Sequence, residues 1–339
     1  MKKTLVAMAV MAVAGAASAQ VTLYGKIDAG LEYKDVGGTT TTKLQSGLFS
    51  GNRWGMKGSE DLGGGLTANF MLEGGFNVDT GTSAQNSGPG MAAGVAGQNR
   101  IFGRTAQVGV SGAFGTVTVG RQYTPTDNVL WMTDPMGATG AVTGPMYNVF
   151  YQTGTYDTLA NGRQNNAISY SIPSMSGVNA QVMFAPDESD ADAHRYAGAN
   201  LSYAAGPLTA TIAWENTTAT GAAKSTTGWL TGLAYDLGAF KLGGEVMGGT
   251  TATDSTTTGW YLGASTPMGA ATLSAGYANA KVTTLAGVET KSNAMGINAV
   301  YSLSKRSNVY GGWLSREEQV GAAATVKTNG LVAGLRHDF

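Results

Sequence analysis

The chain contains no cysteine among its 339 residues. Disulfide bonds, thiolate metal sites and cysteine nucleophiles are therefore excluded. Its two histidines, His194 and His337, provide neither a histidine cluster for a metal ion nor a convincing Ser/His/Asp triad. We therefore expect a protein that is not an enzyme and that needs no cofactor or metal.

Charge is also scarce, since charged residues make up 13% of the chain, about half the usual fraction. Lysine and arginine number 21 against 22 acidic residues, so no basic excess points to nucleic acid. Beyond the N-terminal segment, no apolar stretch reaches the roughly 18 to 20 residues that a membrane helix needs. A chain this poor in charge and without membrane helices favours a transmembrane β-barrel, whose strands hide their hydrophobic side chains by alternation.

Residues 1–19 have the pattern of a secretory signal peptide. Two lysines open the segment, an apolar run over 5–14 follows, and small residues end it at Ala19. An N-terminal membrane anchor is the alternative, but no stop-transfer pattern follows. We expect cleavage before Gln20 and a single exported β-barrel domain over 20–339.

Sixteen segments of about ten residues alternate between apolar and polar side chains, separated by clusters of glycine and small polar residues. Short and long connections also alternate, as in a membrane barrel with short periplasmic turns and long external loops. A soluble β-sandwich or solenoid would show the same alternation, but the even strand count and the low charge favour an all-β, antiparallel, sixteen-stranded transmembrane barrel. The expected strands are 21–34, 50–60, 66–78, 100–111, 115–124, 165–173, 177–186, 196–205, 208–218, 227–237, 240–250, 259–267, 271–282, 292–303, 307–318 and 328–339.

The segment 208–214 illustrates the two faces of such a strand. Ile212 and Trp214 share one face, which suits lipid, while Thr209 and Thr211 share the other, which suits water. Aromatic residues near strand ends predict the two girdles at the membrane interfaces. These residues are Trp260, Tyr261, Tyr277, Tyr301, Tyr310 and Trp313.

Several motifs over the whole exported part of the chain resemble the Gram-negative trimeric porins of the β-proteobacterial type, as found in Burkholderia, Comamonas, Bordetella and Neisseria relatives. The matching stretches are Val21–Gly25, Asn52–Gly65, Leu72–Gly74, Gly103–Gly112, Phe114–Arg121, Leu303–Ser307 and Gly334–Phe339. The resemblance implies a general diffusion porin of the outer membrane, a homotrimer that passes ions and small hydrophilic solutes. It also implies contact with outer-membrane lipids and lipopolysaccharide, and a terminal Phe339 that the barrel-assembly machinery reads as an insertion signal. A substrate-specific channel stays open as an alternative, because it differs from a general porin only in details of the lumen.

The resemblance places a ring of arginines at the narrowest part of the pore, on Arg53, Arg104 and Arg163. Arg53 shares its face with Lys57, while Trp54 and Met56 point the other way, so alternation alone directs Arg53 into the lumen. Arg163 has the same inward parity as Asn165 and Ala167. Arg104 shares its parity with Ala106, Val108 and Val110, so simple alternation would direct it outward, and a less apolar trimer interface could reconcile the two. We also expect Lys57 and Arg121 to line the lumen.

Carboxylates are expected to oppose these arginines and to set a transverse field. Alternation directs Glu73 inward, and the resemblance makes the long connection 125–161 a third loop folded into the lumen. This connection carries Asp127, Asp134 and Asp157, of which Asp127 and Asp134 are the best candidates. The family's usual Pro-Glu-Phe-Gly-Gly signature is replaced here by Asp134-Pro135-Met136-Gly137, which leaves the acidic partner open. The acidic run 187–192 could hold calcium, although a solvated external loop is the simpler interpretation because EF-hand spacing is absent.

Overall fold

The computed structural model describes residues 20–84, 100–137, 144–150, 162–187 and 194–339. The predicted signal peptide over 1–19 lies outside these residues. Eighteen antiparallel strands of these residues form one sheet, and two short helices among them lie in the longest connection between strands. Within the described ranges, no helix is long and apolar enough to cross a membrane.

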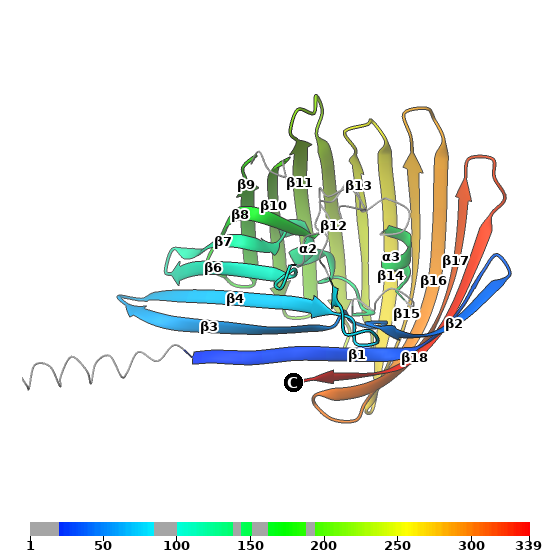
Figure 1. The fold of residues 1–339 in the computed structure, drawn as a ribbon, viewed down its shortest axis with the longest axis horizontal. Coiled ribbons are helices and arrows are strands. Elements are labelled where there is room, and N and C mark those ends of the chain that lie inside the picture. The colour runs from blue at the N-terminus through cyan, green and yellow to red at the C-terminus, as the bar shows by residue number, and fades with distance from the viewer. Residues whose placement is uncertain (1–19, 85–99, 138–143, 151–161, 188–193) are drawn as a thin grey trace, which may run out of the picture.

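The strands follow one another around the molecule in chain order (Figure 1). In the first half they are β1 (Gln20–Val36), β2 (Thr39–Ser46), β3 (Arg53–Gly63), β4 (Leu66–Phe76), β5 (Ser83–Ala84), β6 (Thr105–Gly112), β7 (Gly115–Tyr123), β8 (Arg163–Ser171) and β9 (Val178–Ala185). In the second half they are β10 (His194–Ala205), β11 (Leu208–Ala219), β12 (Thr226–Asp236), β13 (Lys241–Thr250), β14 (Thr256–Met268), β15 (Ala271–Thr283), β16 (Glu289–Ser302), β17 (Ser307–Val320) and β18 (Val326–Asp338). The helices are α2 (Pro125–Leu130) and α3 (Pro145–Phe150).

The sheet closes on itself because β1 pairs with β18, with Lys26 opposite Asp338 and Val36 opposite Thr328. The other edge of β1 is shared: β2 pairs with residues 29–36 and β3 with residues 20–26. In the same way β5 and β6 pair with successive parts of β4. The eighteen strands therefore occupy sixteen positions, and the predicted closed antiparallel barrel of sixteen strands is confirmed.

Each of the sixteen predicted segments coincides with one of these strands, whereas β2 and β5 were not predicted. The predicted alternation is also confirmed in β11, where Ile212 and Trp214 are 56% and 46% exposed while Thr211 and Ala213 are 4% and 3% exposed. Exposed apolar side chains on the outside of a closed barrel form the surface that lipid covers.

The prediction of the aromatic girdles is wrong for two of its six residues. Trp260, Tyr277 and Tyr301 are exposed, as a girdle requires, but Tyr261 and Tyr310 are buried. Tyr261 directly follows Trp260 in β14, so the two side chains must point to opposite faces of the sheet. Both buried tyrosines donate hydrogen bonds to aspartates inside the barrel, Tyr261 to Asp134 and Tyr310 to Asp28.

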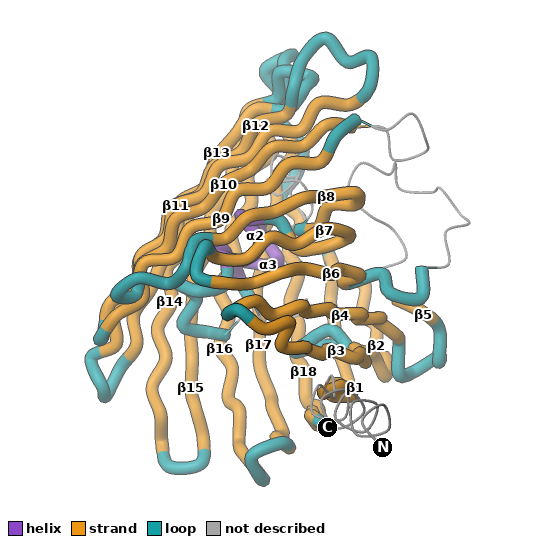
Figure 2. Tube along the Cα trace, turned by 90° about the vertical axis from the view of Figure 1, so that its left-hand side faces the viewer, coloured by secondary structure: helices purple, strands orange, loops and turns teal. Residues whose placement is uncertain are grey.

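In Figure 2 the two helices lie behind the front strands β6 to β9. Helix α2 contacts β9 to β12, and α3 contacts β14 to β17. Thr124 caps α2 by accepting a hydrogen bond from the Asp127 backbone N–H at 3.1 Å, and Pro125 starts the helix. Buried side chains of both helices form one apolar cluster with Ala213, Leu230, Met247, Tyr261, Ala278, Ala280, Ala294 and Leu314 of the strands.

A second segment, 47–52, connects β2 to β3 and folds over the inner side of the wall. The buried carboxylate of Asp28 accepts hydrogen bonds from the backbone N–H groups of Phe49 and Ser50 at 3.1 and 2.7 Å. It also accepts one from the Tyr310 hydroxyl at 2.5 Å, and the Phe49 and Tyr310 rings pack with their centroids 4.9 Å apart. This segment brings Arg53, which follows it, to the inside of the barrel.

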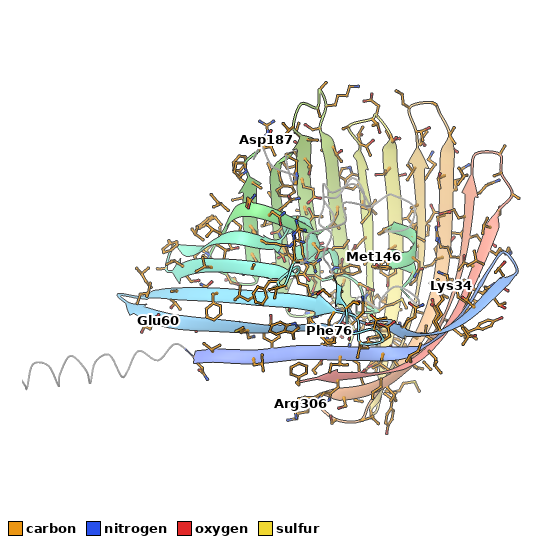
Figure 3. The ribbon with its side chains drawn as sticks, viewed as in Figure 1. Lys34, Glu60, Phe76, Met146, Asp187 and Arg306 are labelled. Atoms are coloured by element: carbon orange, nitrogen blue, oxygen red, sulfur yellow. The ribbon has the colours of Figure 1, made fainter. Side chains whose placement is uncertain are left out.

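The two ends of the barrel chain meet at Gly25 and Phe339. Their backbones exchange two hydrogen bonds, each 3.1 Å long, and a Cβ atom on Gly25 would lie 2.3 Å from the Phe339 ring. The terminal ring therefore covers a glycine, an arrangement that helps to fix the register of neighbouring strands. Long connections and short turns lie at opposite ends of the barrel, as Asp187 and Arg306 show (Figure 3).

We expect Gly25→Val to weaken barrel closure more than Phe339→Ala does. The added Cβ atom would collide with the ring and would lie only 2.7 Å from the Arg53 carbonyl oxygen. The midpoint of thermal unfolding, read from heat-modifiable migration on a gel, measures this. Gly25→Val combined with Phe339→Ala should recover part of the loss. Equal midpoints for Gly25→Val and the unchanged protein would show that the ring does not fix this register.

Candidate constriction site

Three arginines that lie far apart in the sequence border one cavity of about 710 Å³ inside the barrel. Arg53 begins β3, Arg104 directly precedes β6, and Arg163 begins β8. The cavity is also lined by Tyr123 at the end of β7 and by residues of the connection that carries the helices. The structure thus brings together the three arginines that the sequence singled out.

Arg104 is held by a buried ion pair. Its Nε atom donates a 2.6 Å hydrogen bond to Glu73 in β4, and the two residues are 5% and 6% exposed. The second carboxylate oxygen of Glu73 accepts a hydrogen bond from the Tyr24 hydroxyl at 3.0 Å. Arg104 lies inside although alternation directed it outward, because the regular β4–β6 register begins only with Glu73 opposite Thr105, and the Arg104 backbone N–H also donates to the Glu73 carbonyl oxygen at 3.1 Å, outside that register. A special trimer interface is not needed to explain it.

Tyr123 links Arg104 to Arg163. Its hydroxyl accepts a 2.6 Å hydrogen bond from Arg104 Nη2 and a second one from Arg163 Nη2. The Arg163 guanidinium also lies over the Tyr123 ring, 4.1 Å from its centroid, which is favourable for a cation and an aromatic face. The parity argument for Arg163 does not hold in detail, because a register shift between β7 and β8 lies between it and Ala167.

Two further basic residues, Lys26 and Arg336, line the same cavity and were not predicted. Lys26 lies directly opposite Arg53 across the β1 and β3 ladder, and it forms a 3.5 Å ion pair with Asp338. Arg336 in β18 places its guanidinium 5.2 Å from the centroid of the Phe49 ring. Leu335, His337 and Phe339 share the outward face of the strand, so alternation places Arg336 on the inward face. The sequence therefore contained the information that Arg336 points into the barrel.

The connection between β7 and β8 also lines the cavity. Its lining includes Asp127 and Asn128 of α2, Trp131 at the C-terminal end of α2, and Tyr147 of α3. Burial raises the pKa of the Tyr147 phenol above its ordinary value, so this group stays neutral and contributes no charge. Asp127 is the one carboxylate among the described residues that line the cavity.

Asp134 lies elsewhere. It accepts a 2.6 Å hydrogen bond from the Tyr261 hydroxyl of β14 and a 2.8 Å hydrogen bond from the backbone N–H of Met136. It does not line the cavity of the arginines. Asp157, the other acidic residue of this connection, lies outside the described residues.

The two residues predicted to line the lumen have different surroundings. Lys57 borders a smaller cavity with Gln20, Asn69 and Gln107, and its ammonium lies 5.4 Å from the centroid of the Tyr24 ring. Arg121 donates to the Gly103 carbonyl oxygen at 2.8 Å and to the Asn165 side chain at 2.6 Å, and it borders neither of these cavities.

The calcium hypothesis concerns residues that are mostly outside the described part of the chain. Of the acidic run, only Asp187 is described, and it accepts a hydrogen bond from the Thr220 hydroxyl. Among the residues that the structure describes, no group of three or more histidine, aspartate or glutamate side chains could hold a metal ion.

Known proteins with a similar sequence or structure share this architecture. A family model described as Gram-negative porin matches residues 4–318. Outer membrane porin protein 32 of Delftia acidovorans is 34% identical over 98% of this chain and 95% of its own, and an outer membrane porin of Bordetella pertussis is 30% identical over the full length of both chains. The solved anion-selective porin from Comamonas acidovorans superposes with a TM-score of 0.77 at 29% identity, covering 95% of this chain and all of the other. The chain therefore belongs to the Gram-negative porin family, whose members are channel-forming transport proteins of the outer membrane rather than enzymes.

Proposed function

We propose that this porin is a passive, water-filled channel for ions and small hydrophilic solutes whose narrowest part is lined by arginines. The observation that carries the proposal is the grouping of Lys26, Arg53, Arg104, Arg163 and Arg336 around one cavity that Asp127 also lines. Rings of charged side chains at a constriction select ions by charge and limit their size.

The charges in this cavity support a modest preference for anions. Glu73 pairs with Arg104, and Asp338 pairs with Lys26, so these two cations are largely neutralised. Among the described residues that line the cavity, five basic side chains stand against the single carboxylate of Asp127, so the lining carries a net positive charge. A cleft with an excess of one charge raises the local concentration of the opposite ion. The anion selectivity of the Comamonas porin agrees in sign with this proposal.

Assembly and export belong to the same proposal. We infer that residues 1–19 are a signal peptide, that three copies form a homotrimer, and that Phe339 helps the barrel-assembly machinery to recognise the chain. Outer-membrane lipids and lipopolysaccharide would surround the exposed apolar side chains. The fold is shared with OmpT of Vibrio cholerae, solved in a trimer form, at a TM-score of 0.70 and 15% identity.

The test is the single-channel conductance of the purified protein in a planar bilayer with a salt gradient across it. We expect conductance steps that arrive in threes, an ohmic current and a reversal potential of the sign that anion preference gives. A correctly folded protein that forms no channel would contradict the proposal. Conductance that saturates with one solute but not with salt would instead indicate a substrate-specific channel.

A further inference from the structure

We infer that glycines on the inner wall set the bore of this channel, because they let one turn of the β7–β8 connection lie flush against the strands. We call Thr133–Gly137 the anchor turn and the residues Gly232, Gly243, Gly263 and Gly276 the wall glycines. The inference rests on the proposed function, in which this connection faces the arginines. It concerns pore size, whereas the arginines concern charge.

Three wall glycines form a row across the sheet. In the strand register Gly243 of β13 lies opposite Gly263 of β14, and Gly263 lies opposite Gly276 of β15. Gly232 of β12 lies beside this row, opposite Glu245. Glycine within a strand weakens it and is typical of a site where another backbone approaches closely. A row of such residues across three strands is therefore expected to accommodate a neighbouring segment.

The neighbouring segment is the anchor turn. A Cβ atom on Gly243 would lie 2.2 Å from the Thr133 carbonyl oxygen and 3.0 Å from the Pro135 ring. One on Gly232 would lie 2.3 Å from the Thr133 hydroxyl, and one on Gly276 would lie 2.8 Å from the Met136 sulfur. A Cβ atom on Gly263 would lie 2.1 Å from the Tyr261 hydroxyl oxygen and 3.2 Å from the Pro135 ring. A larger residue at Gly232 or Gly243 would therefore occupy space that the turn now fills, whereas one at Gly263 or Gly276 would also displace Tyr261, the residue that holds Asp134.

Hydrogen bonds hold the turn in this place. The Thr133 hydroxyl donates to Glu245 at 2.6 Å, and the Tyr261 hydroxyl donates to Asp134 at 2.6 Å. All four residues are buried, and Asp134 also accepts from the Met136 backbone N–H within the turn. The departure of Asp134-Pro135-Met136-Gly137 from the family signature thus has a structural role, since this aspartate fastens the turn to β14.

The anchor turn is directly connected to the pore lining. Trp131, Gly137 and Asp127 border the cavity that Arg53, Arg104 and Arg163 also border. Because the strands lie behind the turn, a turn pushed off the wall can move only into the lumen. To restore the ordinary contact of 3.4 Å, Thr133 would have to retreat by about 1 Å from an alanine at 243. The wall glycines therefore determine how far the connection protrudes toward the arginines.

Alanine substitutions test this inference. We expect Gly243→Ala to lower the single-channel conductance by a factor of about 1.5 and to reduce the size of the largest neutral polymer that enters the pore. Gly276→Ala should have a smaller effect, because the nearest atoms to its Cβ belong to side chains, the Met136 sulfur and the Tyr261 ring at 2.8 Å each, and not to the backbone of the turn. The control is Gly311→Ala in β17, on the outward face of the sheet, whose Cβ atom would meet only the Val332 carbonyl oxygen at 3.6 Å.

A rescue experiment separates contact with the turn from a general effect on the strands. Gly232→Ala conflicts first with the Thr133 hydroxyl. We therefore expect the double variant Gly232→Ala/Thr133→Ala to have nearly the conductance of the single variant Thr133→Ala. Gly243→Ala conflicts with a backbone oxygen, so Thr133→Ala should not recover it. If both glycine variants respond alike, the wall glycines act only on the strands and the inference is overturned.

Failure of this inference and failure of the proposed function give different results. Suppose that the Gly243→Ala and Gly276→Ala barrels fold but keep the conductance and the polymer exclusion of the unchanged protein. This result would overturn the role of the wall glycines and leave the arginine site intact. If Gly243→Ala does not fold, Gly276→Ala alone decides by the same measurement. A reversal potential that does not respond to the arginines would overturn the charged constriction, whatever the glycine variants do.

Discussion

Replacing both Arg53 and Arg163 by serine is expected to change the channel from anion-preferring to cation-preferring. The two guanidinium groups are two of the five basic side chains that line the cavity, whose described lining contains one carboxylate, and Arg104 and Lys26 form ion pairs with Glu73 and Asp338. Their loss removes two positive charges from the cavity lining while Asp127 stays, so the local excess of anions disappears. The measurement is the reversal potential in a potassium chloride gradient, whose sign should invert. Conductance should stay equal or rise, since serine is smaller than arginine.

A double variant with the same change in net charge provides the control. Arg195 in β10 and Arg306 in the turn after β16 are both exposed and lie outside the cavity. Arg195→Ser combined with Arg306→Ser should leave the reversal potential within experimental error of the unchanged protein. If both double variants shift it equally, the total charge of the barrel, and not the constriction, sets ion preference.

Arg104→Met is expected to lower the free energy of unfolding by about 3–5 kcal/mol, because it leaves the Glu73 carboxylate buried without its cation. Glu73 would keep only the hydrogen bond from Tyr24 at 3.0 Å. The Tyr123 hydroxyl would lose one of its two arginine donors as well. Unfolding in guanidinium chloride, with the barrel in detergent micelles, measures the loss.

Two comparisons make this prediction specific to a buried pair. Arg104→Met combined with Glu73→Leu should recover much of the loss, since no buried charge remains. Lys281→Met removes a cation from an exposed pair with Glu289, 3.2 Å apart, and should cost far less, because solvent screens an exposed pair. A similar, small cost for Arg104→Met would mean that water reaches Glu73 from the lumen.

The sequence predicted the strands well because alternation is a direct consequence of strand geometry. Lipid on one side and water on the other demand opposite side chains at successive residues, and β11 shows this plainly. It missed β2 and β5, since both lie in polar connections where no apolar face identifies a strand. The same holds for segment 47–52, whose inward fold depends on Asp28 and Tyr310, which are distant in the chain.

Alternation predicted the candidate site less reliably, because several of its residues lie where strands begin or shift register. Arg104 lies one residue outside β6, and Arg163 lies beyond a shift in the β7–β8 ladder. Asp134 looked like an electrostatic partner because its acidity is visible in the sequence, whereas its bond to Tyr261 depends on folding. Arg336 could have been found, since its neighbours on both sides face outward.

The closure of β1 on β18 also has a consequence for the speed and order of folding. Neighbouring hairpins such as β15 and β16 join residues that are close in the chain, but the closing ladder joins Lys26 to Asp338 and Val36 to Thr328. Contacts between such distant residues must overcome the entropy of closing a very large loop, which makes them slow. The bond from Tyr310 to Asp28 has the same long range. We therefore expect hairpins to form early and the seam between the two ends to form last, so that a chain truncated before β18 accumulates as an open, unsealed sheet.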